Sequence, residues 1–239
     1  AGKCLAAILS AAMALSLTAC AGGVKGGESG SAASSLGSSE SALEGTTGEK
    51  IVNIGVTSTV NTLNPLLMDG VEVNKYATGL MFLPLMELNA DMEFEGMLAD
   101  SITAEDENHF LVHIDDKAMW SDGQPVTADD VVYTALRLCS PAIANTAMMY
   151  YVFEGVGDDG FVEPGADHID GITKVDEKTV RFATKEPMSL ITFQNSYARY
   201  LMPLPKHIIG DIPEDQLASN QWFSHPDVVS GPYRMRSEE

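Results

Sequence analysis

The chain has 239 residues, with 34 acidic against 14 basic side chains and a formal net charge of −20 at pH 7. Such an acidic surface repels nucleic acid and anionic lipid headgroups, which excludes a nucleic-acid-binding role. The length allows one large or two small domains with a real core, and the three cysteines show neither a CxxC spacing nor a disulfide framework.

The first twenty residues have the features of an export signal. Lys3 is a minimal positive region, and residues 5–17 form an apolar run too short for a spanning helix, which needs roughly 20 residues. Leu17-Thr18-Ala19-Cys20 resembles a bacterial lipobox, whose cysteine becomes the lipidated first residue. We therefore expect residues 1–19 to be a lipoprotein signal peptide and Cys20 the lipid anchor; the alternative is a plain secretory signal that contains a cysteine.

Residues 20–50 are rich in Gly, Ser and Ala and offer almost nothing to bury. This composition predicts a flexible tether that holds a domain roughly 30 Å from the membrane, at random-coil scaling of about 5–6 Å × √n. Such a tether favours a Gram-positive cell surface, with the periplasm as the alternative.

The remaining sequence alternates between strand and helix patterns. Alternating apolar residues predict strands at 51–57, 85–88, 110–114, 172–175 and 179–184, the last two as a hairpin. Apolar residues at helical spacing predict helices at 73–81, 142–153, 187–197 and 213–221.

The most informative stretch is 117–141. Ser121-Asp122-Gly123 predicts a turn, and Thr127 followed by Asp130 predicts a capping box that opens a helix. The apolar stripe of this helix ends in Cys139, which we expect to be a buried free thiol. A functional interpretation would make an acid/base or metal cluster of Asp122, Asp129 and Asp130. We favour a structural interpretation, because a turn and a helix cap explain each of the three positions.

Other candidate sites have structural interpretations. Gly155 to Gly160 fits G-x-G-x-x-G, but the pattern lacks the following helix and carries two aspartates, so we expect an acidic surface loop. Calcium binding there lacks the EF-hand ligand pattern. His109 and His113 share one face of a strand without a third ligand, which favours a solvated face over zinc. Trp120, Tyr150 and Tyr151 are expected in the core rather than stacked on a ligand.

Several motifs resemble one family. The run from Trp120 to Val132 (Trp-Ser-Asp-Gly-x-Pro-Val-Thr-Ala-x-Asp-Val-Val) resembles the peptide-binding (family 5) extracellular solute-binding proteins of ABC importers. Similar matches in the family's order are Leu63-Asn64-Pro65, Leu98-Ala99-Asp100-Ser101, Leu204-Pro205-Lys206 and Ser230-Gly231-Pro232-Tyr233-Arg234. The resemblance covers residues 51–236, and family members continue into a second lobe, so the chain resembles their N-terminal portion.

The resemblance implies an α/β fold of the periplasmic-binding-protein type (type II, three-domain variety), here incomplete. Residues 51–82 would form the first part of the large lobe, residues 83–205 the inserted small domain, and residues 206–239 the truncated second part of the large lobe. It also implies that Asn64, Asp69 and Gly70 lie near the ligand. A turn aspartate before glycine is the alternative for Asp69.

The function that the resemblance implies is capture of short peptides outside the cell and their delivery to an ABC permease. We expect a monomer that is not an enzyme, because no nucleophile or metal-hydrolase motif is present. No cofactor and no metal are expected, and the membrane is a partner only through the lipid anchor. The alternatives are a nickel-chelate or sugar ligand within the family, or a truncated surface lipoprotein with a structural or adhesive role.

Overall fold

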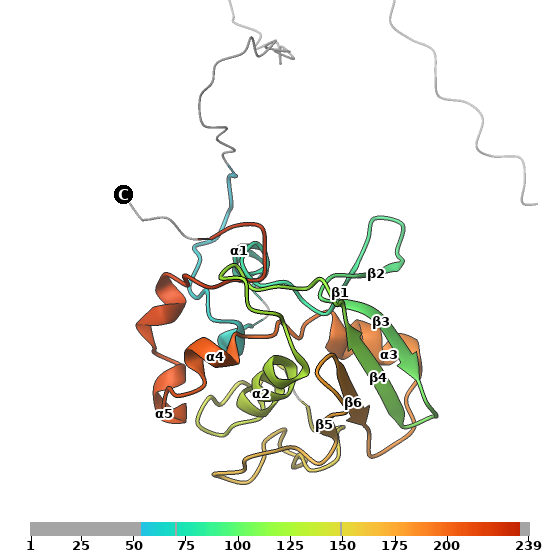
Figure 1. Ribbon diagram of the computed structural model, residues 1–239. Coiled ribbons are helices and arrows are strands. Elements are labelled where there is room, and N and C mark those ends of the chain that lie inside the picture. Colours follow the sequence, from blue (N-terminus) through green and yellow to red (C-terminus); the bar gives the residue numbers. More distant parts are fainter. Residues whose placement is uncertain (1–53, 70, 149, 235–239) are drawn as a thin grey trace, which may run out of the picture. The chain divides into compact units, whose positions relative to one another are not determined.

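The computed structural model describes residues 54–69, 71–148 and 150–234 (Figure 1). The predicted signal peptide, the lipidation residue Cys20, the tether and the proposed ligand residue Gly70 lie outside this part of the chain. Within it, no helix has both the length and the apolar character that crossing a bilayer requires.

The larger sheet of the described part has four antiparallel strands. Its strands, in spatial order, are β3 (Ala99–Ala104), β4 (His109–Ile114), β6 (Thr179–Ala183) and β5 (Ile172–Lys174). A second, two-stranded hairpin pairs β1 (Met86–Leu88) with β2 (Phe94–Gly96). The predicted strands at 85–88 and 110–114 and the predicted hairpin at 172–184 are therefore confirmed.

Strand β4 shows why one face of this sheet is buried. Phe110, Val112 and Ile114 are fully buried, whereas the residues between them are partly exposed, as the two-residue repeat of a strand requires. Val112 pairs with Ile102 of β3 on one side and with Val180 of β6 on the other, so the apolar positions of neighbouring strands are in register.

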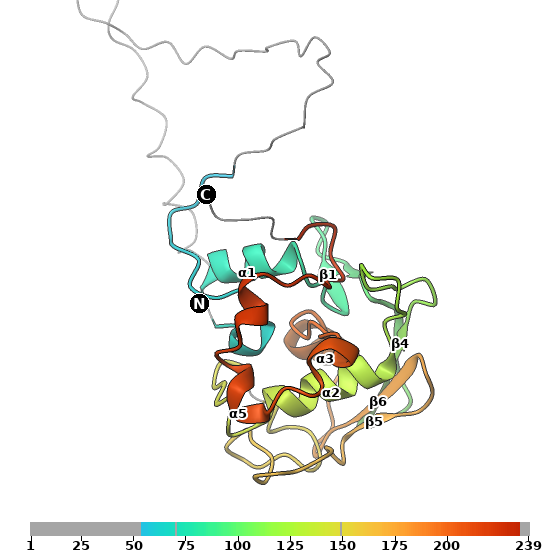
Figure 2. The same ribbon diagram turned by 60° about the vertical axis from the view of Figure 1, so that its left-hand side comes forward.

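The helices differ in length. The longer ones are α1 (Glu72–Gly79) and α2 (Ala128–Leu138), and α2 packs against β5 and β6 (Figure 2). Shorter elements follow in the C-terminal part: α3 (Leu190–Phe193), which continues as the π-helix η2 (Gln194–Ala198), then α4 (Lys206–Ile209), α5 (Glu214–Leu217) and the 3₁₀ turn η3 (Gln221–Ser224). A further 3₁₀ turn, η1 (Pro65–Leu67), precedes α1.

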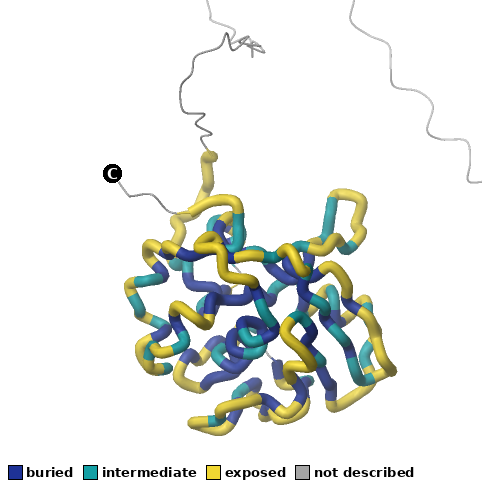
Figure 3. Tube along the Cα trace, in the orientation of Figure 1, coloured by how far each residue is buried: buried dark blue, intermediate teal, exposed yellow. Residues whose placement is uncertain are grey.

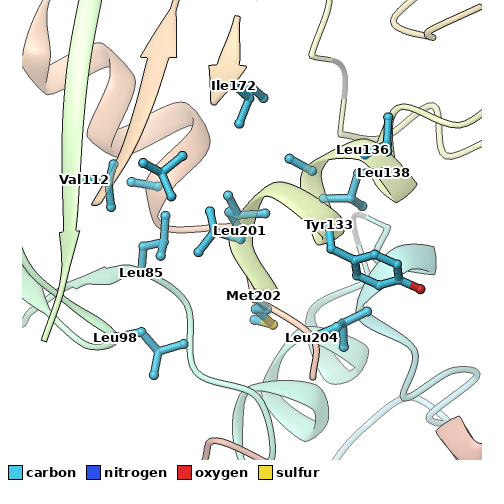
Figure 4. Close-up of a cluster of buried hydrophobic side chains, with 14 of the residues drawn as sticks. Leu85, Leu98, Val112, Tyr133, Leu136, Leu138, Ile172, Leu201, Met202 and Leu204 are labelled. Atoms are coloured by element: carbon cyan, nitrogen blue, oxygen red, sulfur yellow. The ribbon is translucent and has the colours of Figure 1, made fainter. Parts of the chain in front are cut away.

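Buried residues gather in the interior of the described part, and exposed residues lie on its outer loops (Figure 3). One cluster joins segments that are far apart in sequence: Leu136 of α2, Val112 of β4 and Leu201 lie together in it (Figure 4). The same cluster includes Leu66 and Leu217. The cluster therefore contains residues from each of the three predicted segments, 51–82, 83–205 and 206–239. The boundaries between these segments stay a prediction.

The predicted capping box at the start of α2 is confirmed, and it does more than cap the helix. The Asp130 carboxylate is only 3% exposed and accepts the Thr127 N–H at 2.8 Å and the Thr127 hydroxyl at 3.1 Å. It also accepts the indole N–H of Trp120 at 3.3 Å and the backbone N–H of Lys206 at 2.9 Å. Because these donors belong to Thr127 at the start of α2, to the Trp120 loop and to the start of α4, Asp130 joins the loop, α2 and α4.

The other two aspartates of this stretch have separate structural contacts. Asp122 accepts the Gln124 N–H at 3.0 Å within the predicted turn, where Gly123 has a φ of 88°. Asp129 pairs with Lys174 at 2.6 Å. The three carboxylates thus act in a turn, an ion pair and a cap.

Two predicted elements are wrong. Residues 54–57 form no strand, and Ile54 is 70% exposed, because no described strand pairs with them; residues 51–53 lie outside the described residues. The helix predicted at 142–153 is absent from its described residues. There Ala144 has a φ of 54°, and the Asn145 side chain accepts the N–H of Ala147, so local turn contacts replace the helical ones.

Replacing Asp130 with alanine is expected to lower the free energy of unfolding by at least about 3 kcal/mol, because four donors lose a buried acceptor. The neighbouring Asp129→Ala change removes a partly exposed ion pair and is expected to cost less than about 1 kcal/mol. Urea denaturation of the two variants provides the comparison. Equal losses would show that the Asp130 contacts contribute little.

Cys139 is buried as predicted, and burial raises the pKa of its thiol to about 12. Because the thiolate is the reactive form, we expect Cys139 to resist alkylation by iodoacetamide at pH 8 until the protein unfolds. Mass spectrometry of the peptide that contains Cys139, with and without urea, measures this. Rapid labelling of the folded protein would contradict it.

Candidate functional site

The candidate site is a cavity of about 360 Å³ between α1, the 147–151 segment and the π-helix region. Its size lies within the usual range of small-molecule sites, about 300–1,000 Å³. We call it the tyrosine pocket; its lining residues are Met68, Asp69, Lys75, Ala147, Met148, Tyr150, Tyr151, Ser196, Tyr197 and Tyr200. Four of the seven tyrosines of the chain line it.

Asp69, one of the predicted ligand residues, lies in the wall of this pocket. Its Oδ1 accepts the Val71 N–H at 2.9 Å and the Asn74 side-chain amide at 3.2 Å. Its Oδ2 accepts no hydrogen bond from the described residues. Asp69 is therefore a turn residue, as one interpretation of the sequence had it, and still offers one carboxylate oxygen to a ligand.

Asn64, another predicted ligand residue, is buried and does not line the pocket. Its Oδ1 accepts the Leu66 N–H at 2.9 Å, which caps η1, and its Nδ2 donates to the Leu217 carbonyl at 3.2 Å. These bonds fix the entry of the 65–69 segment that ends at Asp69. A contact of Asn64 with a ligand stays a prediction, as does one of Gly70.

Two basic residues meet at one ring of the pocket. The Lys75 ammonium lies 5.0 Å from the centroid of the Tyr200 ring, and the Arg199 guanidinium carbon lies 5.1 Å from it. Cations at this distance are attracted by the ring quadrupole, at about 0.5–1 kcal/mol for exposed sites. Lys75 is placed by α1 and Tyr200 by the segment after η2, so this contact joins two walls of the pocket.

The two neighbouring tyrosines at 150 and 151 differ in burial. Tyr150 is 1% exposed and belongs to the core, as predicted. Tyr151 is 47% exposed, so its expected place in the core is wrong. The chain makes a turn here, in which the Phe153 N–H donates to the Tyr150 carbonyl at 3.0 Å, and Tyr151 lies within that turn at the surface.

The other aromatic wall comes from the π-helix η2. Its wider turn carries Ser196 and Tyr197 into the pocket lining; such helices are rare and are frequent at functional sites. The Tyr197 ring packs edge-on against Phe153 at 4.9 Å and Tyr150 at 5.7 Å. The core thereby holds the ring at a fixed angle.

The hydroxyls of Tyr150 and Tyr197 remain protonated at neutral pH, because both pKa values are raised. Burial raises the pKa of Tyr197, and the nearby Tyr151 raises it further. Burial also raises the pKa of Tyr150 well above its usual range, and its hydroxyl is buried without a hydrogen-bond partner among the described residues. The wall is therefore rich in hydrogen-bond donors.

Sequence reasoning missed most of this pocket. It weighed Tyr150 and Tyr151 as stacking residues but did not consider Lys75, Tyr197 or Tyr200. The concentration of tyrosines at 150–151 and 197–200 is the signal that could have found it.

The remaining candidates lie elsewhere. The acidic surface loop predicted at residues 155–160 is confirmed and borders a cavity of about 640 Å³, and its Asp158 pairs with Lys185 at 3.3 Å. His109 and His113 pair with Asp106 and Asp100, on the outer face of the sheet. Within residues 54–234, apart from the two undescribed positions, no three His, Cys, Asp or Glu side chains are grouped to hold a metal.

Comparison with known proteins gives the family. A sequence model of bacterial extracellular solute-binding proteins, family 5 (middle region), matches residues 93–239. The peptidoglycan-binding protein YepA of Agrobacterium fabrum is 28% identical in an alignment 198 residues long, which covers 78% of this chain and 28% of YepA.

Solved structures agree on the fold. Listeria monocytogenes OppA bound to peptide matches 80% of this chain and 37% of its own, with a TM-score of 0.62 and 21% identity. The substrate-binding domain of an oligopeptide ABC transporter from Bacillus anthracis matches 73% of this chain and 33% of its own, with a TM-score of 0.59 and 19% identity. The fold is thus the mixed α/β fold of oligopeptide-binding proteins, and the chain spans less than two fifths of the length of these relatives.

The Tyr150 hydroxyl, which has no hydrogen-bond partner among the described residues, leads to a prediction about stability. Tyr150→Phe is expected to leave the free energy of unfolding unchanged or to raise it by up to about 1 kcal/mol, because it removes a buried donor without a partner. Tyr133→Phe, the matched control, removes a hydroxyl that donates to the Ile209 carbonyl at 3.1 Å and is expected to cost about 1 kcal/mol. Thermal and urea denaturation measure both. Equal destabilisation would mean that Tyr150 has a partner in solution.

Proposed function

Because the chain belongs to the bacterial extracellular solute-binding proteins of family 5, we propose that it captures short peptides and delivers them to an ABC permease. Proteins of this family bind solutes and are not enzymes, which agrees with the absence of catalytic motifs from the sequence. The family also implies an extracytoplasmic location. Peptide as the ligand is supported by the Listeria relative, whose structure contains a peptide, and the importer by the Bacillus anthracis relative.

The observation that carries the proposal is the tyrosine pocket with Asp69 in its wall. The free Oδ2 of Asp69 accepts an N–H of the peptide backbone or its terminal ammonium, which is a charge-assisted bond. The exposed ring of Tyr151 packs against a ligand side chain. Met68 and Met148 give this wall the adaptability that a binder of varied peptides needs.

In this proposal the protein is a monomer held to the membrane by lipid on Cys20, with residues 20–50 as the tether. Residues 51–82 and 206–239 belong to the large lobe, and residues 83–205 form the inserted domain. Asn64 and Gly70 lie with Asp69 on the cleft side of the large lobe. Hinge closure over the peptide then needs the second lobe that longer family members have.

A second candidate ligand is a peptide derived from peptidoglycan. It is favoured by the relative YepA, whose name assigns it peptidoglycan binding. The tyrosine pocket suits this ligand equally well, because such peptides combine ammonium and carboxylate groups. Nickel chelates or sugars, and a structural or adhesive role, remain as outcomes of the following experiment.

Isothermal titration of the chain with defined tripeptides and with a peptidoglycan tripeptide tests the proposal. We expect Tyr151→Ala to weaken peptide binding about tenfold, because it removes an aromatic contact worth about 0.5–1.5 kcal/mol beyond its buried area. Tyr76→Ala is the matched control, since Tyr76 is an exposed tyrosine outside the pocket lining. The Tyr76→Ala variant should bind the peptides with the same affinity as the unchanged protein.

Three outcomes would contradict the proposal. Equal effects of the two tyrosine changes would remove the pocket from the binding site. Binding of a nickel–histidine chelate or of sugars, without binding of peptides, would move the ligand to another class. Binding of none of these would favour the structural or adhesive role.

A further inference from the structure

Lys75 and Arg199 are the two basic residues that lie over the Tyr200 ring of the pocket. In the described part of the chain, neither has a carboxylate oxygen within the 4.0 Å of an ion pair, although both contact the Tyr200 ring. Several other basic side chains do pair with carboxylates; they are Arg137, Lys174, Arg181, Lys185 and Lys206. Among the described residues, therefore, no carboxylate is in ion-pair contact with the positive charge beside the pocket.

The hydroxyls that line the pocket also lack partners among the described residues. The side chains of Tyr151, Ser196, Tyr197 and Tyr200 line the cavity, and none of their hydroxyls has a hydrogen-bond partner among the described residues. Each of these hydroxyls can donate one hydrogen bond and can also accept, and the Oδ2 of Asp69 is a further acceptor. A carboxylate has two oxygens with about four acceptor positions, so it can accept from several of these hydroxyls and from the Lys75 ammonium at once.

We propose that a carboxylate of the ligand binds in the tyrosine pocket, with Lys75 as its counter-ion and tyrosine hydroxyls as additional donors. The inference rests on the proposed peptide binding and makes it more specific: the ligand is a short peptide with a free carboxylate at this position. The Tyr200 ring holds the Lys75 ammonium in place without cancelling its charge. Asp69, in the same cavity, repels a second carboxylate and favours the ammonium end of the ligand.

The competing interpretation is that Lys75 only covers the Tyr200 ring and keeps its charge in water, as exposed lysines commonly do. The two interpretations differ in one measurable respect. A counter-ion changes the preference between a carboxylate and an uncharged amide on the ligand, whereas a covering side chain affects both ligands equally.

The test is titration calorimetry of the chain with Ala-Phe-Ala, its C-terminal amide, and Ala-Glu-Ala amide. We expect the simple amide to bind about 10- to 100-fold more weakly than the free acid, the range for a hydrogen bond to a charged group. Recovery of affinity with the glutamate peptide would place a side-chain carboxylate in the pocket. No recovery would place the C-terminal carboxylate there.

Three variants connect this preference to Lys75. Lys75→Met should weaken binding of the free acid about 10- to 100-fold and leave binding of the amide unchanged. Lys75→Arg should retain most of the affinity. Lys117→Met makes the same charge change at an exposed lysine outside the pocket and should change neither affinity.

The inference is overturned if the unchanged protein binds acid and amide equally, or if Lys75→Met weakens both equally. In either case peptide binding itself stands. If no peptide binds the unchanged protein, the proposed function fails and the inference fails with it.

Discussion

The buried carboxylate of Asp130 is the contact on which the arrangement around the pocket depends. Its side chain joins the loop at Trp120 to the start of α4. Its backbone carbonyl accepts the Thr134 hydroxyl at 2.7 Å, and that hydroxyl accepts the Leu204 N–H at 2.8 Å. The segment 204–206 is therefore tied to α2 at two points. Because the chain reaches this segment directly from Tyr200, the same hydrogen bonds position one wall of the tyrosine pocket.

Local patterns predicted the parts of the fold that local forces decide. The capping box at Thr127, the turn at Asp122 and the strand around Val112 depend on neighbours in sequence or on a two-residue repeat, and each is confirmed. The strand predicted at 51–57 failed in its described residues because a strand also needs a partner, which no pattern within the stretch reveals. The helix at 142–153 failed because Asn145 satisfies the backbone with its own side chain.

The pocket was largely invisible to the sequence because it is made of long-range contacts. Asp69 could be suspected from a family resemblance. Lys75, however, becomes a site residue only because Tyr200, which is distant in sequence, lies beneath its ammonium. The distinction between a buried Tyr150 and an exposed Tyr151 likewise depends on a backbone turn that no apolar repeat records. No sequence motif indicates Lys75 and Arg199. They stand out only in the three-dimensional structure, where both lie over the Tyr200 ring and neither contacts a carboxylate of the described residues.

The π-helix has a consequence for how this protein can diverge from its relatives. A π-turn accommodates one residue more than an α-turn, while Phe193 before it and Leu201 after it both remain buried. Deletion of a single codon between Gln194 and Ala198 would restore a regular helix and leave those two anchors in place. It would rotate the side chains between them by about 100°. A single deletion would therefore change which side chains of this segment line the pocket and would spare the core.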